Sequence, residues 1–135
     1  MPTDLQPTFA ALRTILRNHQ AAWSVQEDSA TCYCLAGVPG PATLKSWGGQ
    51  RRVPTIPVAW VHLGKSAVSY HLMGVAASTA LLAGLSKDLK ARMQGKTCFN
   101  FKTVDDAVFR ELDDVTAKSI AGFKRAGFAS EPDAG

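Results

Sequence analysis

The chain has few charged residues and no long run of charge of one sign. Only 19% of its 135 residues are charged, and it has no basic run longer than Arg51-Arg52, so the net charge of +4 is spread along the chain. A diffuse positive charge is weak support for an anionic partner. Because 46% of the residues are hydrophobic, the composition is that of a globular protein and excludes intrinsic disorder.

The chain also lacks a hydrophobic segment suited to a membrane or to export. The uncharged run 66–86 is long enough for a membrane span, but it contains polar residues and changes its hydrophobic period midway. That change is typical of a strand followed by a helix. The N-terminal MPTDLQPTF lacks the basic start and apolar stretch of a signal peptide. We therefore expect a cytoplasmic protein without membrane contact, with its three cysteines reduced.

Familiar catalytic motifs are absent as well. The sequence contains no GxSxG, HExxH, P-loop or strand-linked GxGxxG. Cys32 and Cys34, two residues apart, would project from one face of a strand, and Cys98 would join them if its strand were near. Their spacing is not that of a CxxC zinc site, and buried free cysteines usually behave as small hydrophobes. Ser66, Ser69 and Cys98 are nucleophiles in type only, so we expect no catalytic residue, metal or cofactor.

What the sequence does contain is a pattern of alternating strands and amphipathic helices. Hydrophobic periodicity and turn residues predict, in chain order, a helix at 4–21, a strand near 30–37, a loop at 39–57, a hairpin of 58–63 and 66–73, a leucine-rich helix at 78–94, a strand at 97–102, and helices at 103–115 and 116–127. The order α-β-loop-β-β-α-β-α-α predicts an α+β, two-layer sandwich, with about four antiparallel strands and helices on one face. We assign 1–129 to a single domain and expect 130–135 to be disordered.

Polar residues at three positions are expected to begin helices. Asp4 would cap the first helix, and Ser86 would cap a new turn inside the leucine-rich helix. Thr103 with Asp106 three residues later resembles an acidic capping box for the helix that follows. These caps would set where each helix starts.

The hairpin contains the histidines of most interest. A two-residue Gly64-Lys65 turn would pair His62 with residue 67 and His71 with Val58. About four residues would then separate the two histidines along the strands, and at ~3.3 Å per residue one metal ion could not bridge them. The core face of the hairpin would carry Ala59, Val61, Leu63, Val68, Tyr70 and Leu72, and the opposite face Val58, Trp60, His62, Ser69 and His71.

That opposite face, together with the long loop, is the candidate binding surface. We expect Trp60, Ser69 and His71 of the hairpin to bind a small ligand with loop residues Trp47, Arg51 and Arg52. Alternatively, a C-terminal helix or a partner subunit covers this face. In the second case the protein would be a homodimer. The basic and aromatic loop residues also leave weak binding of nucleic acid or another anionic ligand as an alternative.

Two segments late in the chain resemble a known family. Over about residues 55–127, the chain is similar to the YdhG-like domain of unknown function. The similarity lies in the hairpin, the leucine-rich helix and the segments LKARMQGKTCFNFKTVDD and FRELDDVTAKSIAGFKRAGF. The resemblance implies a bacterial protein with a compact α/β sandwich related in shape to frataxin. It also implies, as an alternative function, an intracellular iron chaperone, as described for one member of the wider family.

The carboxylates bear on that alternative, because iron handling of the frataxin type relies on clustered oxygen ligands. The first predicted helix offers only Asp4, and the other acidic residues gather on the late helix: Asp105, Asp106, Glu111, Asp113 and Asp114. Acidic residues near a helix start also favour the helix dipole, so this cluster has a structural explanation. We therefore expect a non-enzymatic small-ligand binding or assembly module, with the iron chaperone as the alternative.

Overall fold

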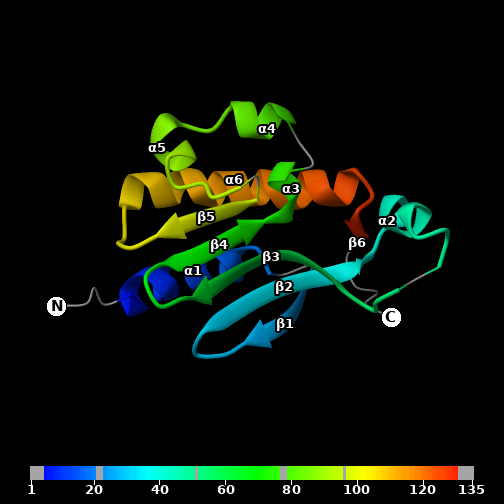
Figure 1. The fold of residues 1–135 in the computed structure, drawn as a ribbon, viewed down its shortest axis with the longest axis horizontal. Coiled ribbons are helices and arrows are strands. Elements are labelled where there is room, and N and C mark those ends of the chain that lie inside the picture. Colours follow the sequence, from blue (N-terminus) through cyan, green and yellow to red (C-terminus); the bar gives the residue numbers. More distant parts are fainter. Residues whose placement is uncertain (1–4, 21–22, 51, 77–78, 96, 131–135) are drawn as a thin grey trace.

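The structure is a computed structural model that describes residues 5–20, 23–50, 52–76, 79–95 and 97–130 (Figure 1). An antiparallel sheet runs through it in the spatial order β1-β2-β3-β4-β5, and a short β6 pairs with β2 beyond this path. The strands are β1 Ser24–Asp28, β2 Cys32–Pro39, β3 Ile56–Leu63, β4 Val68–Leu72, β5 Cys98–Phe101 and β6 Ala129–Ser130. The order places β3, the most hydrophobic part of the hairpin, in the middle of the sheet.

Two helices cover one face of the sheet. α1 Gln6–Asn18 and α6 Asp106–Arg125 both pack against β3 and β4, and they also contact each other. The remaining helices are short: α2 Pro41–Ser46, α3 Met73–Ala76, α4 Thr79–Ala83 and α5 Lys87–Lys90. α3, α4 and α5 pack along α6 (Figure 1). The predicted α+β sandwich is confirmed, with a sheet one strand larger than expected before β6 is counted.

The core lies between the sheet and this helical layer. Every second residue of the central strands points into it, as the period-2 pattern predicts. Tyr70, fully buried, shares a 2.6 Å hydrogen bond with Thr116 of α6, and Thr116 also donates to the Leu112 carbonyl. A buried hydroxyl is thereby satisfied. The other fully buried members include Leu12, Leu16, Leu35, Val61, Leu72 and Phe101.

Several element boundaries differ from the prediction. The polar segment SVQED forms the edge strand β1, where four of five residues are exposed. The predicted 39–57 loop contains α2, the leucine-rich helix is broken into α4 and α5, and the two late helices are one continuous α6. The predicted disordered tail at 130–135 starts one residue too early, because Ser130 belongs to β6 and pairs with Val38; residues 131–135 lie outside the described residues.

The helix caps were predicted in part. Ser86 caps α5 by accepting a hydrogen bond from the Leu89 amide, as predicted. α6 begins later than the Thr103 capping box would place it, because Asp105 is the N-cap and accepts from the Val108 amide. Asp4 lies outside the described residues, and α1 begins after Leu5 without a side-chain cap.

The hairpin register was predicted wrongly by two residues. Leu63 pairs with Val68, so four residues rather than two form the turn, and the Gly64 amide donates to the Ala67 carbonyl at 3.0 Å. Trp60 therefore pairs with His71, and His62 pairs with Ser69. A shift of two residues leaves each side chain on its predicted face, because the strand period is two.

A β-bulge moves Val58 from the open face into the core. Leu35 pairs with Ala59 and Ala36 with Pro57, which leaves Val58 without a partner on β2. The extra residue bends the strand, and Val58 packs with Ile120 and Phe123 of α6, fully buried. The prediction that Val58 shares the Trp60 face is therefore wrong.

The segment around α2 is tied to the turn that ends α6. The Gly40 amide donates to the Phe128 carbonyl at 3.0 Å, and the Ala42 amide donates to the Gly127 carbonyl at 2.8 Å. Thr43 adds a side-chain bond to the Phe128 carbonyl at 2.7 Å. A Cβ at position 40 would lie 2.3 Å from the Gly127 carbonyl oxygen, so this approach of two backbones requires glycine there.

The two edges of the main sheet differ in what lies beside them: one is paired with a further segment, and the other is exposed. On the β5 side, residues 92–94 extend the pairing, with the Asn100 amide donating to the Arg92 carbonyl and the Gln94 amide to the Cys98 carbonyl, both at 2.8 Å. On the other side, β1 is a short, exposed edge that carries Glu27 and Asp28. Charge on a short edge strand opposes pairing with another chain. Within the described residues, no helix is long and apolar enough to cross a membrane.

Candidate functional site on the open face of the sheet

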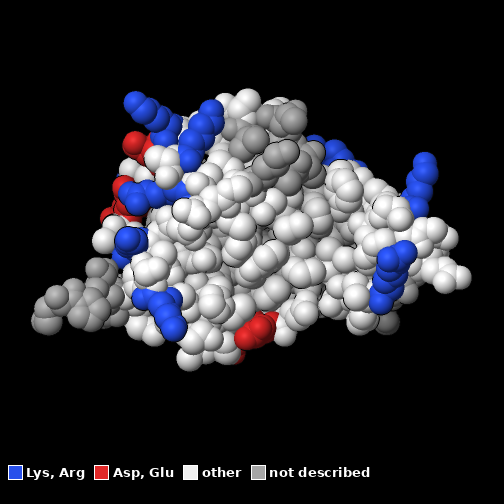
Figure 2. Space-filling view, viewed as in Figure 1, with Lys and Arg blue, Asp and Glu red and all other residues white. Residues whose placement is uncertain are grey.

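The face of the sheet opposite α1 and α6 is named here the open face. Figure 1 looks onto the strands from the side opposite α1, and Figure 2 has the same view. Among the described residues, the middle of this view shows no Lys, Arg, Asp or Glu; the charged groups lie toward its rim (Figure 2). Strand alternation assigns to the open face Cys32, Cys34, Trp60, His62, Ser69, His71, Cys98 and Asn100.

Four of these residues form one row across four strands. Cys34 on β2 pairs with Trp60 on β3, which pairs with His71 on β4, which pairs with Cys98 on β5. The Trp60 and His71 rings are stacked, with centroids 4.5 Å apart and planes 13° apart. The Cys98 Sγ lies 2.7 Å from the His71 Nδ1. The row therefore holds a thiol, an imidazole and an indole in direct contact, each partly exposed.

The environment of His71 keeps its ring neutral at neutral pH. Burial lowers the pKa of His71, and the nearby His62 lowers it further. A neutral imidazole with its proton on Nε2 has a free lone pair on Nδ1, so it can accept a hydrogen bond from the Cys98 thiol. His71 can therefore act as a proton acceptor at the position where Cys98 lies.

The other two cysteines are held as thiols. Burial raises the pKa of Cys34 to about 11, helped by Cys32 and Glu27. The pKa of Cys32 is also raised to about 11, first by burial and then by the charge of Glu27 and a hydrogen bond to it. Since the thiolate is the nucleophile and the metal ligand, both cysteines are poor candidates for either role at neutral pH.

Cys98 lies on the same face as Cys32 and Cys34, but its strand is not near theirs, so the condition for the three cysteines to meet is not fulfilled. β3 and β4 lie between β2 and β5, so three strand spacings of ~4.8 Å separate Cys34 from Cys98 in the row. The two histidines are closer than predicted, because the observed register places them two residues apart along adjacent strands. Even so, no three His, Cys, Asp or Glu side chains of the described residues are grouped to hold a metal ion.

The loop residues of the predicted site lie on a different segment. Trp47 is the C-cap of α2, and exposed Arg52 follows it in the connection to β3, beside the segment tied to Phe128. Arg51 lies outside the described residues. The structure therefore brings together Trp60, Ser69 and His71 on the open face, whereas Trp47 and Arg52 lie in the connection from α2 to β3.

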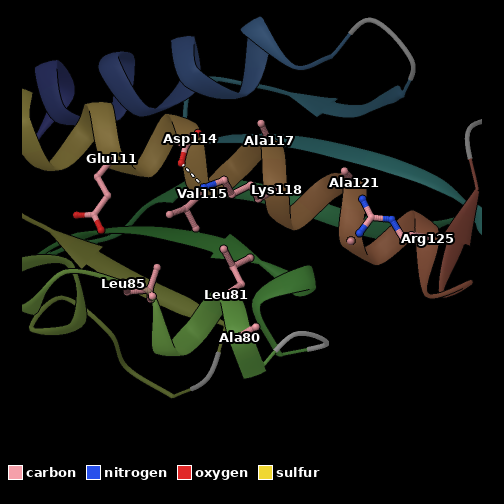
Figure 3. Close-up of a pocket in the computed structure, with 12 residues that line it drawn as sticks. Ala80, Leu81, Leu85, Glu111, Asp114, Val115, Ala117, Lys118, Ala121 and Arg125 are labelled. Atoms are coloured by element: carbon pink, nitrogen blue, oxygen red, sulfur yellow. Dashed lines mark ion pairs between the residues drawn. The ribbon is translucent and has the colours of Figure 1, made fainter.

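A concave groove lies between α4 and α6, and none of the open-face residues lines it. Figure 3 shows its alanine-rich wall on α6, with Leu81 and Leu85 opposite. It has a volume of about 570 Å³. Its acidic groups are engaged, since Asp114 pairs with Lys118 at 2.9 Å and Glu111 accepts from the Ser86 amide at 2.8 Å. The groove therefore offers apolar contacts more than convergent polar groups.

The acidic residues of α6 are dispersed among structural contacts. Asp105 caps the helix, and Glu111 binds Ser86 at the start of α5. Asp113 lies 2.5 Å from the His19 Nε2 at the end of α1, and Asp114 pairs with Lys118 one turn later. Each of these four carboxylates thus has a local partner, and the set points in different directions around the helix.

The contact between Cys98 and His71 was not predicted. Alternation alone indicated that both residues lie on the open face, but it could not show that β4 and β5 are neighbours or which residues pair. The signal that was available is the pattern TCFNF, whose Phe99 and Phe101 had to face the core beside Tyr70 and Val68. Matching those two pairs would have placed Cys98 opposite His71.

The fold and this site define a two-layer α+β protein with a thiol, imidazole and indole in a row on an uncharged sheet face. Comparison with known proteins adds no relative to this description. No family model, no curated protein and no solved structure matches the chain. The similarity to the YdhG-like domain accordingly stays a prediction from the sequence.

Proposed function

We propose that the protein is a non-enzymatic binding module whose open face holds a small, planar, uncharged ligand against the Trp60 indole. The observation that supports this most directly is the Trp60–His71 stack, partly exposed and held at 4.5 Å by the pairing of their strands. Aromatic surfaces of this kind favour stacking with other flat rings. Because both residues lie on the central strands, the platform is rigid before a ligand arrives.

The polarity around the stack favours a neutral ligand. Ser69 and Asn100 pair with each other across β4 and β5, one step along from the row, and both are partly exposed. Their hydroxyl and amide groups can donate and accept hydrogen bonds without a net charge. A ligand that stacks on Trp60 could therefore be oriented by one or two such bonds, the usual arrangement of a small-molecule site.

A fragment screen tests this function. Neutral heteroaromatic fragments are screened by ligand-observed NMR, and bound fragments are located by backbone amide shifts. We expect the shifts to gather on β3, β4 and β5, and Trp60→Leu to weaken binding about tenfold, the loss of roughly 1–1.5 kcal/mol of stacking.

Trp47→Leu is the matched control, because it removes a partly exposed tryptophan from the end of α2 and should leave binding unchanged. Fragments that bind Trp60→Leu as tightly as the unaltered protein would contradict the proposal. So would shifts confined to the groove between α4 and α6.

A further inference from the structure

The pair of Cys98 and His71 has the arrangement of an activated nucleophile. A thiol and a proton acceptor lie within hydrogen-bond distance, 2.7 Å, and a third group orients the acceptor. Here the third group is Trp60, whose indole lies flat against the imidazole. Direct pairing of His71 with Cys98 across β4 and β5 fixes both backbones, so the contact does not depend on a flexible loop.

We infer that Cys98 and His71 form a site for thiol–disulfide exchange, which takes a neutral low-molecular-weight disulfide on the open face. The inference goes beyond the planar ligand proposed above, because it concerns a reaction of the Cys98 thiol. It shares Trp60 and His71 with the stacking surface, but thiol reactivity and fragment binding are measured separately. The surrounding face favours a neutral reagent, since its middle is free of charged groups among the described residues (Figure 2).

The exchange balances with the groups present. His71 Nδ1 accepts the thiol proton as the Cys98 Sγ attacks one sulfur of the incoming disulfide. A new S–S bond forms at Cys98, the original S–S bond breaks, and the departing thiolate takes the proton from the imidazolium. Cys98 is oxidised to a mixed disulfide, and one half of the reagent is reduced to a free thiol.

The position of the other cysteines makes the mixed disulfide the end product. Cys34 lies in the same row but with β3 and β4 between it and Cys98, so the separation of ~14 Å exceeds what a disulfide can span. Both Cys32 and Cys34 also have their pKa raised to about 11, so few thiolates are available to attack. An external thiol would be needed to release Cys98, which makes the modification reversible by a second exchange.

Dithiodipyridine, a neutral aromatic disulfide, tests the inference through the absorbance of the thione that it releases. We expect one fast-reacting thiol per chain, absent in Cys98→Ser and retained in Cys32→Ser and Cys34→Ser. His71→Asn should slow the fast phase at least about tenfold, because asparagine cannot accept the thiol proton during the attack. Fast release that survives Cys98→Ser, or an unchanged rate in a folded His71→Asn, would overturn the inference.

The pH dependence of the unaltered protein gives a test that needs no folded variant. The titratable neighbours of His71 on the open face are Cys98 on β5 and His62 on β3, with Cys34 beyond Trp60. An ordinary thiol reacts about tenfold faster for each pH unit up to about 8.5. Because the pKa of His71 is lowered from its ordinary value, the acceptor is already neutral at pH 7, and the rate through it should be nearly independent of pH between 7 and 8. A full tenfold rise across that unit would contradict the inference.

Discussion

Gly74 is the residue on which the contact between α3 and α6 depends. A Cβ at this position would lie 2.0 Å from the Ser119 carbonyl oxygen and 2.6 Å from the Ser119 Oγ. Ser119 is fully buried, and its Oγ has no hydrogen-bond partner among the described residues. The two backbones therefore approach so closely that only glycine fits, and the serine hydroxyl is enclosed without a partner as a result.

We expect Gly74→Ala to lower the free energy of unfolding by about 2–3 kcal/mol, because the added methyl group forces α3 away from α6. Urea denaturation followed by circular dichroism measures the change. Gly122→Ala is the control of opposite sign. Gly122 lies inside α6, and a Cβ there would have no neighbour within 4 Å, so alanine should stabilise the helix by about 0.5–1 kcal/mol. Equal effects of the two substitutions would contradict the close contact.

At the scale of the elements, α6 is the helix that contacts most of the other helices and the central strands. It covers β3 and β4, contacts α1, and supports α3, α4 and α5 along its length. Its first turn is fixed by Asp105, whose carboxylate accepts a hydrogen bond from the Val108 amide at 3.2 Å. If the first turn of α6 were not fixed, the packing of Val108 and Phe109 in the main core would be weakened.

Asp105→Ala should therefore cost about 1 kcal/mol of stability, the usual effect of removing an N-cap. Asp105→Asn is the matched control, because asparagine caps as well as aspartate and removes only the charge. Thermal and urea unfolding of the three proteins measure the difference. If Asn destabilises as much as Ala, the charge rather than the hydrogen bond is responsible, and the capping role is wrong.

Elements with a strong hydrophobic period could be predicted from the sequence, and those formed by tertiary context could not. The faces of β3 and β4 followed from alternation, but their register did not, because a shift of two residues preserves every face. β1 was not predicted, because Gln26, Glu27 and Asp28 are polar and exposed and show no hydrophobic alternation. The segment is a strand because it pairs with β2. The break between α4 and α5 was predicted only in part: Ser86 was identified as the cap of a new turn, but the leucine stripe continues across it and indicated a single helix.

The same limit applies to the candidate site. Trp60, Ser69 and His71 share a face in the sequence pattern, and the structure keeps them together. Cys98 is separated from His71 by 27 residues, and only the pairing of β4 with β5 makes them neighbours. Contacts of this kind depend on strand order, which periodicity does not encode.

At the scale of the whole molecule, stability should be graded from β3 outward. β3 lies between β2 and β4 and under both long helices, whereas β1 has one neighbour and four exposed residues. Segments with few buried contacts open at lower free energy than the core. The edge residues 24–28 are thus expected to open without unfolding the rest of the sheet.

Native-state hydrogen exchange measures this gradient. We expect the hydrogen-bonded amides of β1 to exchange at least about a hundredfold faster than those of Val61 and Tyr70, a difference of roughly 3 kcal/mol in opening free energy. The β5 amides, whose outer edge is paired with residues 92–94, should resemble those of β4 rather than those of β1. Uniform protection across the sheet would contradict local opening at β1.

The hydrogen bonds that tie α2 to the turn after α6 also set an order for folding during synthesis. Thr43 and the Phe128 carbonyl are 85 residues apart, and β2 gains β6 from the same late segment. During synthesis, residues 40–43 therefore cannot form these hydrogen bonds until nearly all of the described chain has emerged from the ribosome. Loop closure over such a span is slow, so residues 38–43 stay without these partners until 127–130 have been made and have folded back.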